Sequence, residues 1–169
     1  VITVTPTGNS GSIIVDNTAP FHPTGFTTGG VEATGGIVET DYWNDSNSGL
    51  TVTVPVDDDV SLVGGEIQIR ARISDSSDSA YSDLGVAATI LNADRGTNKI
   101  VTLVNTTGIN IANQVTGLPD YGQGKYIVFQ AVMMDLAGNQ TVGSSSTTLT
   151  IDTEIPSTFT TGAVTTSQG

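Results

Sequence analysis

The sequence predicts an all-β chain built around a seven-stranded Greek-key β-sandwich, and three observations lead to this prediction. Glycine accounts for 20 of the 169 residues, aromatic residues for only 5%, and no long helix-forming run occurs. Segments rich in Val, Ile, Leu and Thr recur at short intervals, separated by Gly, Asn, Asp and Ser. Seven such segments with turns between them are typical of a two-sheet Greek-key sandwich.

The predicted strands differ in how they should meet the core. Residues 49–56 and 65–73 alternate between apolar and polar side chains, so each should turn one face to the core. Residues 126–134 are apolar on nearly both faces, which indicates a central strand. Trp43 should pack at one end of the sandwich, and Tyr126 should form either a tyrosine corner or part of the core. The seven predicted strands are 31–40, 49–56, 65–74, 84–90, 99–104, 126–134 and 145–151.

One eight-residue segment, which we interpret as the junction between two repeats, occurs twice in the chain. Ile13-Ile14-Val15-Asp16-Asn17-Thr18-Ala19-Pro20 corresponds to Leu149-Thr150-Ile151-Asp152-Thr153-Glu154-Ile155-Pro156, and Phe-Thr-Thr-Gly follows each copy. A repeated boundary indicates one full unit of a tandem array. We therefore expect residues 1–20 to be the last strand of a preceding repeat with its linker, 21–156 a complete repeat, and 157–169 the start of the next.

The chain is strongly acidic. Seventeen acidic and five basic residues give a net charge of −12 and an isoelectric point near 4.1. This sign argues against a nucleic-acid partner, because binding phosphates requires positive charge. No segment is long and apolar enough to enter a membrane, and there is no cysteine. The acidity either keeps an array soluble and self-repelling or binds divalent cations through carboxylate oxygens.

Acidic and amide side chains should gather at one end of the predicted sandwich. In this topology the loops after 49–56, 84–90 and 126–134 meet at one pole, together with the linker that enters the domain. Carboxylates at such short distances from one another repel unless a cation lies among them. Ca²⁺ is such a cation, and it takes six to eight oxygen ligands. The alternative for residues 135–139 is ordinary turn chemistry. The predicted Ca²⁺ ligands are Asp16, Asp57, Asp58, Asp59, Asp94, Asp135 and Asn139, with Asp152 serving the next repeat.

Such a cation would fix the angle between successive domains. Pro20 and Pro23 would stiffen the same linker by restricting φ. At the opposite pole, Asp45-Ser46-Asn47-Ser48-Gly49 lacks the downstream Glu of an EF-hand loop. We interpret this run as a turn, with a second cation site as the alternative.

Three segments resemble the tandem Ig-like repeats of very large bacterial surface adhesins, many of which are secreted by type I systems and end in RTX repeats. They are Val15–Pro20, Asp135-Leu136-Ala137-Gly138-Asn139 and Leu149–Asp152, and the resemblance covers nearly the whole chain. It implies a secreted, calcium-stiffened spacer at the bacterial cell surface that projects an adhesive tip, with adjacent repeats as its partners. Glu154-Ile155-Pro156 departs from Thr18-Ala19-Pro20, which weakens the transfer of ligand roles to the second junction.

Enzymatic function is not expected. His22 is the only histidine, no cysteine nucleophile exists, and no Gly-x-Ser-x-Gly or phosphate-binding glycine loop occurs. Two alternatives to a spacer stay open. One is a module of the same adhesin that binds a glycan or peptide through calcium, using Trp43, Tyr81 and Tyr121. The other is a filament subunit in which residues 1–15 donate a strand to a neighbouring chain.

Overall fold

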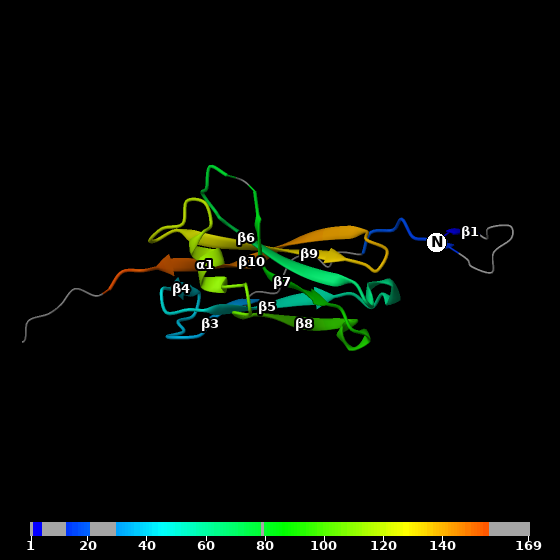
Figure 1. Cartoon of the computed structure of the whole chain (residues 1–169), viewed down its shortest axis with the longest axis horizontal. Helices are drawn as coiled ribbons and strands as arrows, with labels where there is room; N and C mark the ends of the chain where they lie inside the picture. Colours follow the sequence, from blue (N-terminus) through cyan, green and yellow to red (C-terminus); the bar gives the residue numbers. More distant parts are fainter. Residues whose placement is uncertain (1, 5–12, 21–29, 79, 156–169) are drawn as a thin grey trace, which may run out of the picture.

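The computed structural model describes residues 2–4, 13–20, 30–78 and 80–155, and within these ranges strands dominate (Figure 1). Three short helices accompany them: η1 (Val60–Leu62), η2 (Asn92–Asp94) and α1 (Ile111–Thr116). The predicted all-β character is therefore confirmed. The strands are β1 (Ile2–Val4), β2 (Ile13–Val15), β3 (Val31–Thr34), β4 (Tyr42–Asn44), β5 (Gly49–Val56), β6 (Glu66–Ile73), β7 (Ser82–Thr89), β8 (Thr97–Leu103), β9 (Tyr126–Met134) and β10 (Gln140–Asp152).

Two sheets form the body of the domain and face each other across a single core (Figure 1). The larger has the order β4-β10-β9-β6-β7, and the smaller has the order β3-β5-β8. All pairs in them are antiparallel except β4 with β10, which is parallel. Alternate residues of both sheets, among them Leu50, Ile69 and Phe129, are buried between the layers. Burial of these apolar side chains is the main source of stability.

The predicted first strand, 31–40, is right only in its first four residues, which form β3 and pair with β5. Residues 35–41 are not a strand, and β4, which was not predicted, begins after them and pairs with β10 of the other sheet. Gly35 and Gly36 follow β3 with φ of +78° and +64°, a conformation that side chains with a Cβ rarely adopt. This turn lets the chain leave one sheet and join the other. The described part of the domain consequently has eight strands from β3 to β10 rather than seven.

Helix α1 was not predicted. Ile111 and Val115, one turn apart, are both buried, so the helix contributes one apolar stripe to the core. Asn110 caps it by accepting a hydrogen bond from the backbone N–H of Asn113, and Gly117 ends it. The helix is six residues long, which is too short for its periodicity to stand out in the sequence.

The aromatic residues give a mixed result. Trp43 is 1% exposed, so its predicted packing is confirmed. Both predictions for Tyr126 are wrong, because it is 50% exposed and its hydroxyl has no hydrogen-bond partner among the described residues. Ile127 and Phe129 take the inward positions of β9, which leaves Tyr126 on the solvent face. Tyr121 packs against the core instead.

The two copies of the junction lie at opposite ends of the domain. The linker, residues 16–20, approaches one end, whereas β10 runs to the other (Figure 1). Before the linker, β1 pairs with β2, so both ends of residues 2–15 meet in an antiparallel pair. Pro23, His22 and residues 157–169 lie outside the described residues. No described helix has the length and hydrophobicity that crossing a membrane requires.

Candidate functional site

Three loops meet at the end of the domain that the linker approaches, and we call this end the linker pole. They are residues 57–65, 90–96 and 135–139. The first two are joined by hydrogen bonds from Ile90 N to Gly65 O (2.8 Å) and from Gly64 N to Ile90 O (2.9 Å). The backbone N–H of Leu136 points to Ser61 O at 3.4 Å, which joins the third loop to the first.

Asp135 shapes the turn between β9 and β10. Its carboxylate is 2% exposed and accepts two hydrogen bonds from Asn139, at Oδ1 from the backbone N–H and at Oδ2 from the side-chain amide, both 2.9 Å. Gly138, with φ of +90°, closes the turn. Turn chemistry thus accounts for the local conformation. It leaves Asp135 as a buried carboxylate that no described lysine or arginine pairs with.

Asn139 also binds the linker. Its Nδ2 donates to the main-chain carbonyl of Asp16 at 3.1 Å, while Asp16 Oδ1 accepts from the backbone N–H of Thr18 at 3.0 Å. Pro20, at the end of this stretch, is buried. The structure therefore brings Asp16, Asp135 and Asn139 together. The two acceptors around Nδ2 fix the orientation of the Asn139 amide.

The other acids of the pole have separate partners. Asp58 Oδ1 binds Arg95 Nη2 at 2.7 Å, and Asp59 Oδ1 caps η1 through the N–H of Ser61 at 2.8 Å. Asp94 Oδ2 binds Lys99 Nζ at 2.7 Å.

The Asp94–Lys99 pair is mostly shielded from water, with 18% and 14% of the two side chains exposed. The hydrogen bond from Lys99 holds the pKa of Asp94 below its ordinary value, and the N–H of Leu91 adds to this effect. Burial opposes the shift. The pair therefore neutralises part of the charge of the pole without a metal.

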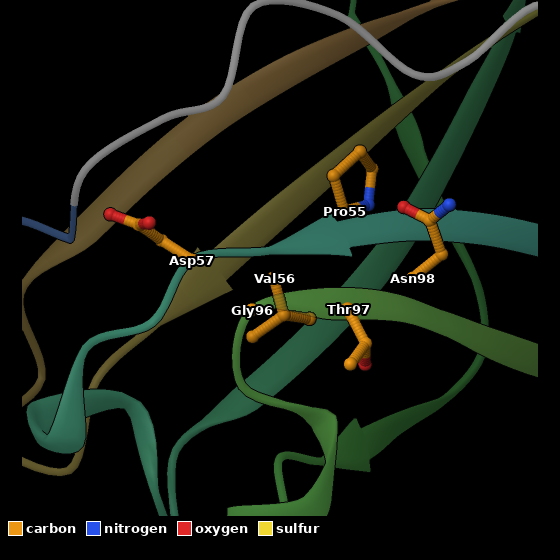
Figure 2. Close-up of a pocket in the computed structure, with 6 residues that line it drawn as sticks. All are labelled: Pro55, Val56, Asp57, Gly96, Thr97 and Asn98. Atoms are coloured by element: carbon orange, nitrogen blue, oxygen red, sulfur yellow. The ribbon is translucent and has the colours of Figure 1, made fainter.

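Asp57 lies beside a shallow hollow of about 310 Å³ at the end of β5 and the start of β8. Figure 2 shows Asp57, Pro55 and Asn98 extending to one side of these strands, and Val56 and Thr97 to the other. Asp57 Oδ1 accepts from the N–H of Asp58 at 2.8 Å. Asp57 is thus the acid of the triplet that neither caps a helix nor binds a basic side chain among the described residues.

Asp152 lies at the opposite end, the far pole, where residues 35–41, 74–81 and 104–125 connect the strands. Its Oδ1 accepts from the N–H of Glu154 and from Gln123 Nε2, both at 3.1 Å. The bond to Glu154 repeats, two residues on, the bond that Asp16 makes to Thr18. The repeated sequence therefore forms the same local turn at both junctions.

The described donors fit calcium only in part. Within residues 13–20, 30–78 and 80–155, no three Asp, Glu or His side chains lie close enough to hold one ion. The oxygens nearest to a common site belong to Asp135 and Asn139 and to the main chain of Asp16. These are the hard donors that calcium prefers, but Asn139 presents its Nδ2 to the other two groups. An ion there would need the Asn139 amide to turn so that Oδ1 replaces Nδ2.

The far pole holds polar residues whose roles the sequence did not reveal. Asn47 is 2% exposed and joins the 35–48 segment through its amide, which donates to Gly35 O (2.9 Å) and Ile37 O (3.0 Å). The turn interpretation of residues 45–49 agrees with these bonds. Asp120 accepts from Ser76 Oγ at 2.8 Å and from the N–H of Ser77, which lowers its pKa.

Comparison with protein-family models, with curated proteins and with solved structures gives no match to this chain.

Proposed function

We propose that the chain is a calcium-rigidified spacer repeat of a large bacterial cell-surface adhesin, which holds an adhesive tip away from the cell. The observation that carries the proposal is the pair of matching Asp turns, at Asp16 and Asp152, on opposite ends of one domain. Units joined at such points extend in line rather than folding back on each other. The net charge of −12 adds repulsion between neighbours, which favours an extended array.

The strand arrangement supports assigning the domain to the Ig-like Greek-key sandwiches. The order β4-β10-β9-β6-β7 faces β3-β5-β8, and from β5 onward the chain changes sheets between β5 and β6, between β7 and β8, and between β8 and β9. β7 pairs with β6 and not with β8, which departs from the constant-type immunoglobulin arrangement. The early change of sheet between β3 and β4 accounts for the additional strand.

The contact between Asn139 and the linker supports a fixed angle at the junction. Asn139 belongs to the turn after β9, and that turn is held by the buried Asp135, so the acceptor carbonyl of Asp16 meets a rigid partner. Pro20 limits backbone freedom on the domain side of this contact. A linker anchored in this way transmits the direction of one domain to the next.

Calcium would hold the same groups together in place of the Asn139 Nδ2 hydrogen bonds. The Asp135 carboxylate, the Asn139 side-chain oxygen and the main-chain carbonyl of Asp16 would bind the ion, which would offset the cost of keeping the Asp135 carboxylate buried without a basic partner. Asp58, Asp59 and Asp94 have other partners and would not be ligands. The ion and the Asn139 Nδ2 hydrogen bonds are alternative ways to satisfy the same oxygens.

Thermal unfolding with calcium and with chelator tests the proposal. A ligand that binds only the folded state at a hundred times its Kd adds about 2.7 kcal/mol, which raises Tm by several degrees. Asp135→Asn should abolish the calcium-dependent part. Glu32→Gln, the same change of charge on an exposed position of β3, should keep it. Equal melting curves with and without calcium would refute the calcium part of the proposal.

A further inference from the structure

All four tyrosines of the chain lie at the far pole, and two of them have intramolecular contacts that explain their positions. Tyr121 packs against the core, and Tyr81 lies under the guanidinium of Arg72, whose Cζ is 5.2 Å from the ring centroid. Tyr42 and Tyr126 are different. They are 39% and 50% exposed, and their hydroxyls have no hydrogen-bond partner among the described residues.

The strand register places Tyr42 and Tyr126 on the two sides of one small residue. Thr150 of β10 is paired with Tyr42 of β4 and also with Tyr126 of β9. Neighbouring residues of the same strands, Trp43 and Ile127, are buried in the core. Because side chains alternate along a strand, all three members of the row Tyr42–Thr150–Tyr126 stand on the solvent face of the larger sheet.

The spacing of this row suits a flat ring. Tyr42 and Tyr126 are two strand spacings apart, which is about 9.5 Å between their backbones. Van der Waals contact takes about 3.5–4.0 Å on each side of an inserted group, so one sugar ring fits between the two tyrosines above Thr150. The threonine hydroxyl and the two phenol hydroxyls would supply hydrogen bonds from below and from the sides.

We propose that Tyr42, Thr150 and Tyr126 form a binding site for a neutral saccharide on the outer face of the larger sheet. The aromatic faces would contact the C–H groups of the sugar, and the hydroxyl groups would bind its hydroxyls. An anionic sugar is disfavoured by the net charge of −12 and because Lys125, next to Tyr126, is paired with Asp75. The other cation at this end of the sheet, Arg72, lies over the ring of Tyr81. The site needs neither calcium nor the linker contact, so it stands independently of the spacer function.

The same face contains a matched control position. Val142 of β10 is 48% exposed and pairs with Val132 of β9 toward the linker pole, away from the tyrosine row. Val142→Ala therefore removes exposed apolar surface from the same sheet without touching the site. Tyr126→Phe keeps the aromatic ring and removes only the hydroxyl, which separates stacking from hydrogen bonding.

The test is titration of the ¹⁵N-labelled chain with cellohexaose, laminarihexaose, maltohexaose and mannohexaose, followed by amide chemical shifts. We expect at least one of them, at millimolar concentration, to shift the resonances of Tyr42, Thr150 and Tyr126. Tyr42→Ala and Tyr126→Ala should each weaken binding by about fivefold, as loss of one aromatic contact requires. Val142→Ala should not change binding, and Tyr126→Phe should retain most of it.

Melting curves will confirm that each variant is folded before its binding is compared. If none of the four sugars shifts these resonances, or if the double variant Tyr42→Ala/Tyr126→Ala binds as tightly as the original chain, the proposal is wrong. It is also wrong if no sugar binds and Tyr42→Ala abolishes self-association in sedimentation experiments. That result would mean that the two tyrosines form a contact between protein chains.

Discussion

The side-chain amide of Asn139 donates a hydrogen bond to the main-chain carbonyl of Asp16, 3.1 Å away and 123 residues apart in sequence. The same amide binds Asp135 Oδ2, so one side chain connects the linker to a buried carboxylate. Two acceptors facing one NH₂ group explain why asparagine serves here and aspartate would not, unless a cation were present. This relationship gives a direct way to separate a calcium-held linker from one held by hydrogen bonds alone.

Replacing Asn139 by Asp should make the domain depend on calcium. In chelator, the new carboxylate would face Asp135 and the Asp16 carbonyl, which should destabilise the fold by about 2 kcal/mol. In calcium, the same carboxylate becomes a ligand, and most of the loss should disappear. Urea unfolding in both buffers measures this. Gln140→Glu, which adds the same charge one residue later on an exposed position, is the control and should show no such recovery.

The Asp94–Lys99 pair should contribute to stability at neutral pH and not in acid. Because the pKa of Asp94 is lowered on folding from 3.8, the unfolded chain binds a proton more readily, and stability falls as pH drops below about that value. Lys99→Met should cost about 1 kcal/mol at neutral pH, since the pair is only partly exposed. Urea midpoints of the two proteins should converge in strong acid. A constant difference across the pH range would contradict this assignment.

Tyr121 should ionise above the ordinary pKa of a tyrosine side chain. Burial is the main reason that the pKa of Tyr121 lies above 10.0, and the nearby Asp45 adds to the shift. The folded state therefore loses stability as pH rises above 10.0, where an unfolded chain would release this proton. Absorbance titration of tyrosinate should show a late phase that is missing in Tyr121→Phe. A late phase that persists in the variant would assign it to another tyrosine.

Asn47 should matter for stability far more than its polar character suggests. Besides its two carbonyl partners, its Oδ1 accepts from the N–H of Asn44 at 2.7 Å, all within a buried site. Asn47→Ala leaves these groups unsatisfied and should cost about 2–3 kcal/mol. Asn98→Ala, at an exposed asparagine of β8, should cost little. Denaturant unfolding of both variants measures the difference, and equal costs would contradict the role assigned to Asn47.

Much of the sandwich could be predicted because several of its strands show a clear pattern of apolar residues in the sequence. The alternation of residues 49–56 and 65–73 gives the inward faces of β5 and β6 correctly, and the apolar run 126–134 identifies the central strand β9. The predicted strand 31–40 was too long, because β3 ends at Thr34 and a turn through Gly35 and Gly36 follows it. The three-residue strand β4 was missed because so short a segment shows no periodicity, and only its pairing with β10 identifies it.

The candidate site could be predicted only in part, because the sequence does not show which side chains from different loops meet. Loop order along the chain suffices to bring 57–65, 90–96 and 135–139 to one pole, since strand direction fixes where each loop lies. The partners of individual acids depend on side chains that approach from other loops. Arg95 forms an ion pair with Asp58, and Lys99 forms one with Asp94. The sequence alone does not give the distance between the two members of either pair. The row of Tyr42, Thr150 and Tyr126 likewise depends on register, which the sequence does not specify.

The central claim is that calcium fixes the linker against the turn between β9 and β10. Because the chain contains no cysteine, two spin labels can be introduced uniquely, at Asn17 in the linker and at Val60, which is 70% exposed at the linker pole. Pulsed dipolar spectroscopy should give a narrow distance distribution in calcium and a broad one after chelation. A distribution that is equally broad in both buffers would contradict the account.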